Sequence, residues 1–102
     1  MIRHIVAFDL KASDPVQIAE DVAEMKAVLE PLVALDVVVS LTVQADLGRV
    51  DGHWPVVLVS EHQTVADLEA YQVHPDHQAA AAEAGRYVAN RAVVDYEYDS
   101  AS

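Results

Sequence analysis

A strand–helix–strand pattern occurs twice in this chain of 102 residues, and this order constrains the fold more than any other feature of the sequence. Residues 2–10 (IRHIVAFDL) alternate between apolar and more polar side chains, which is the period of a strand. Similar strand patterns occupy 35–44, 56–62 and 92–98, with helical patterns after the first and third strands. The order β-α-β-β-α-β predicts a ferredoxin-like α+β sandwich, with helices covering one face of a four-stranded antiparallel sheet.

The first helix is predicted within residues 13–35, where apolar side chains recur at steps of three and four. Asp14 suits the N-cap and Pro15 suits the first helical position. Pro31 is expected to end or bend this helix near Glu30. The predicted apolar stripe consists of Ile18, Val22, Met25, Leu29 and Leu32.

The second helical part is predicted to be split in two by a proline. Thr64 is expected to cap a short helix, which should break at His74 because Pro75 disfavours a helical conformation in the preceding residue. A second, alanine-rich helix is expected to run from about Asp76 to Asn90. The side chains predicted to face inward from the short helix are Val65, Leu68 and Tyr71.

The composition indicates one folded, acidic domain. Hydrophobic residues make up 53% of the chain, and 17 acidic residues against 6 basic ones give a formal charge of −11. We therefore expect neither nucleic acid nor a membrane surface as a partner. The absence of cysteine excludes disulfides and thiolate metal sites. We expect one domain over residues 1–98, a disordered tail at 99–102, and a cytoplasmic location, since the apolar run at the N-terminus is too short for a signal peptide.

The sheet face that the helices leave uncovered is predicted to be partly apolar, and a second copy of the chain is the simplest cover for it. We therefore predict a homodimer. The residues expected on this face are Ile5, Ala7, Val38, Thr42, Val94 and Tyr96.

The segment YQVHPDHQ, residues 71–78, contains the most concentrated chemistry of the sequence. No third ligand can be named beside His74 and His77, so we predict no metal site. A proton-transfer site is the alternative: His77 exchanges the proton, Asp95 fixes its ring, and Tyr71 donates to a developing oxyanion. This hypothesis predicts a His77 ring nitrogen within about 3.2 Å of an Asp95 oxygen. A buried hydrogen-bonded cluster with a purely structural role remains the other interpretation.

The other histidines allow simpler readings. His4 lies on the more apolar face of the first strand. It is interpreted as a core residue, with a ligand contact as the alternative. His74 is interpreted as a helix cap, with ligand binding as the alternative. His53 lies in a loop and is expected at the surface or at an interface. His62 ends a strand, and the sequence names no partner for it.

Several segments together resemble the stress-responsive A/B barrel domain, known as Dabb, over nearly the whole chain. The resemblance implies a dimeric α+β barrel built from two ferredoxin-like subunits. Its most specific elements are the motifs Tyr71-x-x-His74-Pro75-x-His77 and Val94-Asp95-Tyr96.

The resemblance also implies a candidate site. One relative, a plant olivetolic acid cyclase, closes a polyketide ring by aldol condensation, and its catalytic tyrosine and histidine match Tyr71 and His77. A histidine in its first strand matches His4, and an aspartate in its last strand matches Asp95. The chain departs from that relative at Val56, where the cyclase has a histidine, so a different substrate is implied.

Two classes of function follow from these observations. The first is a small-molecule-binding protein, as a cyclase- or lyase-type enzyme acting without a cofactor on a carbonyl compound such as a polyketide. The second is a non-catalytic structural or stress-related homodimer. A monooxygenase ranks below both, because no motif marks a heme or flavin site. A pocket beside His77 would favour the first class.

Overall fold

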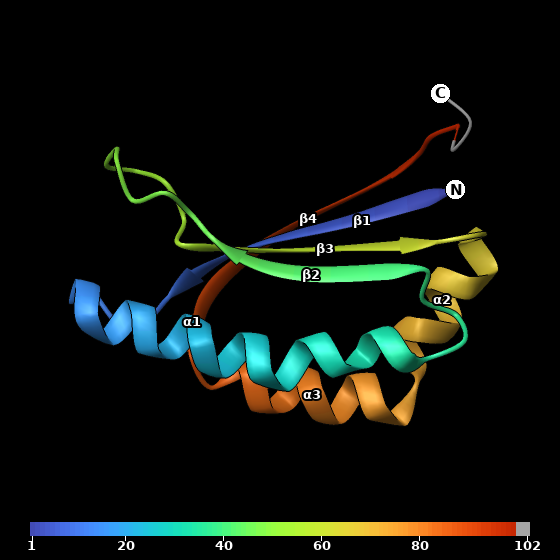
Figure 1. Ribbon diagram of the computed structural model, residues 1–102, viewed down its shortest axis with the longest axis horizontal. Helices are drawn as coiled ribbons and strands as arrows, with labels where there is room; N and C mark the ends of the chain where they lie inside the picture. The colour runs from blue at the N-terminus through green and yellow to red at the C-terminus, as the bar shows by residue number, and fades with distance from the viewer. Residues whose placement is uncertain (100–102) are drawn as a thin grey trace.

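The computed structural model describes residues 1–99, so the predicted tail lies outside the described residues except for Asp99. Figure 1 shows one sheet with the helices on a single face. The strands are antiparallel neighbours in the order β2-β3-β1-β4, which confirms the predicted ferredoxin-like α+β fold. The elements are β1 (Ile2–Leu10), α1 (Pro15–Leu29), a 3-10 helix η1 (Glu30–Ala34), β2 (Ser40–Ala45), β3 (Val56–His62), α2 (Val65–Val73), α3 (Pro75–Gly85) and β4 (Val88–Glu97).

The core lies between the sheet and the helices, as the alternation in the strands predicts. The register of the strands aligns residues across the sheet in rows, and each row belongs to one face. His4 pairs with Ser60 on one side and with Asp95 on the other, so these three side chains share the helix-covered face. The buried apolar residues are Ile2, Val6, Leu10, Val22, Met25, Leu29, Leu32, Val38, Leu41, Val43, Val56, Leu58, Leu68, Tyr71 and Ala84.

The helix boundaries follow the capping signals. The Asp14 carboxylate accepts a hydrogen bond from the backbone N–H of Gln17 at 3.0 Å, and α1 gives way to η1 at Glu30 as Pro31 predicts. His74 has an extended backbone with ψ of 135°, so α2 stops there and α3 starts at Pro75.

Three details differ from the sequence prediction. Helix α3 ends at Gly85 rather than at Asn90, because β4 begins at Val88 to pair with the far end of β1. The second strand begins at Ser40 rather than at residue 35, so its side chains lose the predicted alternation before that point. Val38 is buried, although it was expected on the uncovered face.

A further difference concerns side chains that were predicted to point inward. The strand pattern predicted over residues 35–44 would place Val39 on one face with Leu41 and Val43, but Val39 precedes β2 and is 49% exposed, whereas the other two are buried. Val65 occupies the first position of α2 and is exposed, while Leu68 and Tyr71 are buried as predicted.

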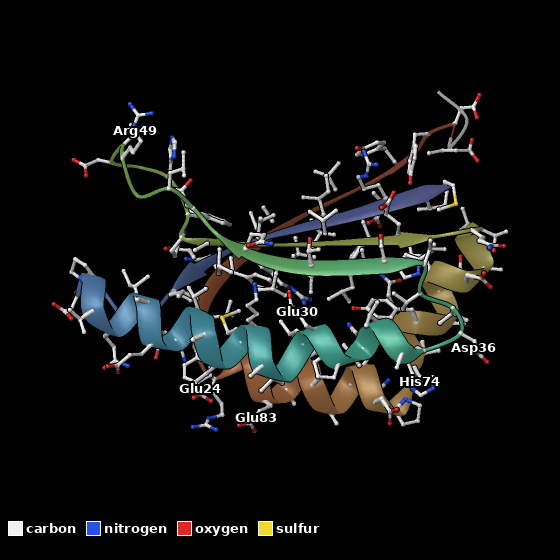
Figure 2. The ribbon with its side chains drawn as sticks, in the orientation of Figure 1. Glu24, Glu30, Asp36, Arg49, His74 and Glu83 are labelled. Carbon is white, nitrogen blue, oxygen red and sulfur yellow. The ribbon has the colours of Figure 1, made fainter. Side chains whose placement is uncertain are left out.

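The two edge strands of the sheet, β2 and β4, differ in how far other parts of the chain cover them. At the β2 edge, the backbone N–H of Val43 donates to Glu30 at 3.1 Å, and its carbonyl accepts from Lys26 at 3.3 Å. Figure 2 shows Glu30 between α1 and the sheet. Helix α1 therefore covers this edge, whereas the side chains of β4 are exposed along almost its whole length. Within residues 1–99, no helix is both long enough and apolar enough to cross a membrane.

Candidate functional site

A pocket of about 350 Å³ opens between the helix-covered face of the sheet and the helices α2 and α3. This volume lies within the range of small-molecule sites. Its polar side chains are His4, Tyr71, Gln72, His77 and Arg91. Apolar side chains and one glycine form the rest of the lining: Val6, Phe8, Leu29, Leu58, Ala81, Ala84, Gly85, Val88 and Val93.

Tyr71 stands at the centre of the polar groups. Its side chain is 1% exposed, and its ring centroid lies 4.4 Å from that of His77, 4.9 Å from that of His62 and 6.3 Å from that of His4. No residue among 1–99 forms a hydrogen bond with the Tyr71 hydroxyl. Because no fully buried polar side-chain atom in this part of the chain lacks a partner, the hydroxyl must reach the open pocket. Burial raises the pKa of Tyr71 to about 12, so the group remains a proton donor.

Asp95 pairs with His4, so the predicted hydrogen bond between Asp95 and His77 is wrong. The His4 Nδ1 atom lies 2.5 Å from an Asp95 oxygen. The strand register explains this pairing, because residues 4 and 95 are directly opposite on β1 and β4. A carboxylate can only accept, so Nδ1 carries a proton, and Nε2 has no partner among the described residues.

His77 is held by the backbone instead. Its Nδ1 atom donates to the carbonyl oxygen of Gln72 at 3.1 Å, which leaves Nε2 without a partner among the described residues. Burial lowers the pKa of His77 below 6.5, so the ring is neutral at neutral pH. His77 and His4 therefore have the same tautomer and a free Nε2, although their Nδ1 atoms are held by different groups.

His62 has both ring nitrogens engaged within the chain, and His74 has one. His62 is fully buried, and its two ring nitrogens bond the Val37 carbonyl at 2.7 Å and the Ser60 hydroxyl at 2.9 Å. His74 accepts from the backbone N–H of Asp76 at 3.1 Å and lies outside the pocket lining, which fits the capping interpretation rather than ligand binding. Figure 2 shows His74 at the junction of α2 and α3.

Three features of the site were absent from the sequence prediction. The partners of His62, the Gln72 carbonyl and the position of Arg91 all depend on the register of the strands and on the course of the α2–α3 junction. Only Arg91 had a usable signal, because it lies four residues before Asp95 and so faces the same side of the strand. The described residues contain no group of three His, Asp or Glu side chains that could hold a metal ion.

The surface loop between β2 and β3 contains the remaining histidine. The His53 Nδ1 atom lies 3.2 Å from an Asp46 oxygen, and both residues border a second hollow of about 710 Å³. This hollow is wide open and lies on the uncovered face, against Ala7, Val57 and Ala92. It is separate from the pocket around Tyr71, since the two have no lining residue in common.

Comparisons with known proteins agree with this architecture. Residues 2–98 match the model of the stress responsive A/B barrel domain, Dabb. A dimeric protein of unknown function with a ferredoxin-like fold from Bacteroides fragilis is 29% identical, covers 95% of both chains and has a TM-score of 0.82. A Dabb family protein from Mesorhizobium loti is 25% identical, again over 95% of both chains, with a TM-score of 0.71.

At lower identity the similarity concerns the fold alone. A hydroxynitrile lyase from Passiflora edulis is 20% identical, with a TM-score of 0.71 over 97% of this chain and 94% of the lyase. No curated protein matches the sequence.

Proposed function

The chain belongs to the stress-responsive A/B barrel family, and we propose that it binds a small carbonyl compound beside Tyr71 and transfers a proton at the carbon next to the carbonyl. One observation carries this proposal. A buried tyrosine hydroxyl has no partner within residues 1–99 and reaches the pocket, together with two histidines whose Nδ1 atoms are already held. An acid and two bases thus border one cavity with an apolar wall.

The chemistry follows from the protonation states. The His4 Nε2 atom takes a proton from the carbon next to the carbonyl, and the electron pair of that C–H bond forms a carbon–carbon double bond. Negative charge develops on the carbonyl oxygen, which accepts a hydrogen bond from Tyr71. Asp95 accepts from Nδ1 and stabilises the positive charge that forms on His4. Return of the proton reverses the step, so no oxidant, reductant or cofactor is needed.

His77 has a supporting place in this scheme. Its ring lies 4.4 Å from that of Tyr71, and its free Nε2 supplies a second acceptor in the pocket. Because its lowered pKa keeps it neutral at neutral pH, His77 can receive a proton from a hydroxyl of the ligand. His4 thus takes the base role that the sequence hypothesis gave to His77, while Tyr71 keeps its predicted role.

The pocket itself argues for binding rather than for a purely structural barrel. A structural protein needs a filled core, whereas this one has an open cavity beside His77 and a free hydroxyl in it. The fold does not decide the reaction, since domains of one fold carry out different chemistries. The hydroxynitrile lyase shows that another protein with this fold is an enzyme, and the assignment here depends on the residues of the site.

We propose in addition that the chain forms a homodimer through the uncovered sheet face. That face includes Val94, which is 60% exposed, and Tyr96, which is 39% exposed. The similar Bacteroides fragilis protein is dimeric. Light scattering at micromolar concentration should give about twice the chain mass, because an apolar face of this kind is normally covered. A monomer at that concentration would contradict the dimer.

Proton exchange in deuterium oxide tests the proposed reaction directly. The probe is 2-octanone, whose hydrogens next to the carbonyl should be replaced by deuterium faster with the protein than in buffer alone, as followed by proton NMR. Tyr71→Phe should slow this exchange about a hundredfold, the usual order for loss of an oxyanion donor. His53→Gln, at the other hollow, is the matched control and should leave the rate unchanged.

Two outcomes would contradict the reaction. One is exchange no faster with the wild-type protein than in buffer. The other is an exchange rate in Tyr71→Phe equal to that of the wild type, with folding verified by circular dichroism.

A further inference from the structure

The pocket around Tyr71 has a charge balance opposite to that of the whole chain. The chain has 17 acidic and 6 basic residues, yet the lining contains no Asp or Glu and one arginine, Arg91. We propose that Arg91 binds a carboxylate of the ligand, so that the preferred ligand is a carbonyl compound that is also an organic acid. This inference rests on the proposed function and names its substrate class.

Arg91 lies on the same side of the sheet as the proton-transfer groups. It pairs with Phe8 on β1, while Asp95 pairs with His4, so the two positions are four residues apart on the helix-covered face. Four residues of strand span about 13 Å, and an arginine side chain bridges roughly half of that. A ligand with about six bonds between its carbonyl and its carboxylate would therefore reach from His4 to Arg91.

Arg91 has no hydrogen-bond or ion-pair partner among the described residues. Arg3, Lys26 and Arg86 each pair with a glutamate in the same structure. Lys11 and Arg49 have no ion pair within residues 1–99 either, but they do not line the pocket. Arg91 is thus the one free cation that borders this cavity in the described part of the chain.

The charge of Arg91 also reaches the reacting groups. Burial is the main cause of the lowered pKa of His77, and the positive charge of Arg91 lowers it further. The same charge attracts an anionic ligand into a chain whose net charge would otherwise repel it.

A carboxylate fits better than a phosphate. A single guanidinium can bind either group through two parallel hydrogen bonds, but its one positive charge matches the one negative charge of a carboxylate. Ala84 and Gly85, at the C-terminal end of α3, also line the pocket. The backbone carbonyls of a helix C-terminus carry partial negative charge and disfavour a second negative charge on the ligand.

Two ketones of equal length test this inference. 7-Oxooctanoate carries a carboxylate where 2-octanone carries a methyl group, so calorimetric dissociation constants measured for the pair isolate the contribution of the charge. The wild-type protein should bind the acid about tenfold more tightly, the order expected for one charge-assisted contact. Arg91→Gln should abolish this preference, and Arg91→Lys should restore part of it.

The matched control is Arg49→Gln, which removes the same charge at the tip of the β2–β3 loop, far from the helices in Figure 2. This variant should keep the wild-type preference. Added salt should reduce the preference of the wild-type protein but have little effect in Arg91→Gln, because only the former depends on charge.

The contrary results distinguish a failure of this inference from a failure of the proposed function. Binding of 2-octanone with an unchanged acid preference in Arg91→Gln would overturn the role of Arg91 and leave the proposed function standing. Tighter binding of octyl phosphate than of 7-oxooctanoate would overturn the carboxylate. If Arg91→Gln changed only the oligomeric state, Arg91 would be an interface residue and the inference would be wrong. Failure of both ketones to bind would contradict the proposed function together with this inference.

Discussion

The two faces of the sheet each carry one polar row across the strands, and the two rows differ in how their hydrogen bonds are completed. On the uncovered face, Arg3 donates to the Tyr96 hydroxyl at 2.6 Å and to Glu61 at 3.1 Å, and Ser40 donates to Glu61 at 2.7 Å. The Ser40 hydroxyl, with the Arg3 guanidinium, lowers the pKa of Glu61. This row links all four strands and has its main polar groups satisfied.

On the helix-covered face, the row through His4 is left incomplete. Asp95 holds one nitrogen of His4 and leaves the other at the pocket, next to a tyrosine hydroxyl without a partner in residues 1–99. Both groups border the open pocket, where a ligand or water can complete their hydrogen bonds. The uncovered row is thus complete within the chain, whereas the incomplete covered row supports the proposal of a ligand site.

The largest expected difference between the faces concerns apolar side chains. Leu58 is 3% exposed on the covered face, and Leu58→Ala should lower the free energy of unfolding by about 2–5 kcal/mol. Val94 is 60% exposed on the other face, and Val94→Ala should change it by less than about 0.5 kcal/mol in the monomer. Urea unfolding at several protein concentrations measures both effects. Equal losses for the two variants at low concentration would contradict the assignment of the faces.

The next effect separates the two carboxylates that belong to the polar rows. Asp95→Asn should slow deuterium exchange of 2-octanone about a hundredfold, because an amide no longer stabilises the charged form of His4. Glu61→Gln is the same chemical change on the uncovered face and should leave the rate unaltered. A loss of rate in both variants, or in neither, would contradict the contrast between the rows.

Acid conditions should weaken the covered face through its histidines. Burial lowers the pKa values of His62 and His77 from 6.5, so the unfolded chain binds more protons than the folded chain below that pH. The free energy of unfolding should therefore fall as the pH decreases from 6.5 through the folded pKa values. Urea unfolding between pH 7.5 and pH 5 measures this decrease, and His77→Gln should show less of it.

The control for the pH series is His53→Gln. The imidazole that this variant removes lies on the surface loop beside Asp46. It should follow the wild-type decrease. Parallel curves for the wild type and His77→Gln would show that burial of His77 has no effect on stability. The lowered pKa values of Asp46 and Glu61 act in the same direction but only in more acidic solution, below 4.5.

The smallest effect is expected from the uncovered polar row itself. Tyr96→Phe removes one hydrogen bond to Arg3 at a solvent-accessible site and should leave the unfolding of the monomer nearly unchanged. Thermal unfolding at low protein concentration measures this. A loss comparable to that of Leu58→Ala would show that the uncovered row is a main source of stability.

Most of the fold could be predicted from the sequence because its signals are local. Alternation defined β1 and β3, and the capping residues Asp14 and Pro75 set helix starts. The predicted strand boundaries were wrong where tertiary contacts, rather than local sequence, determine them. Residues 35–39 alternate like a strand but form a turn after η1, and Val88 joins β4 because β1 offers it a partner.

The sequence singled out three residues that the fold brings to one pocket, but it did not give the pairing of Asp95. His4, Tyr71 and His77 line one pocket, whereas the partner of Asp95 was wrongly assigned. The motif suggested that residues 71–78 face the last strand, but no local signal gives the register between β1 and β4. That register places Asp95 opposite His4. The catalytic roles of these residues remain predictions.

Histidine side-chain NMR tests the central claim most directly, because it observes both faces in one spectrum. With the protein labelled with ¹⁵N, long-range proton–nitrogen spectra should show a protonated Nδ1 and a free Nε2 in His4 and His77. Addition of 2-octanone should shift the Nε2 signals of these two residues, while those of His62, which is fully bonded, and His53, which borders the other hollow, stay in place. Shifts confined to His53, or no shifts at saturating ketone, would contradict a carbonyl-binding site around Tyr71.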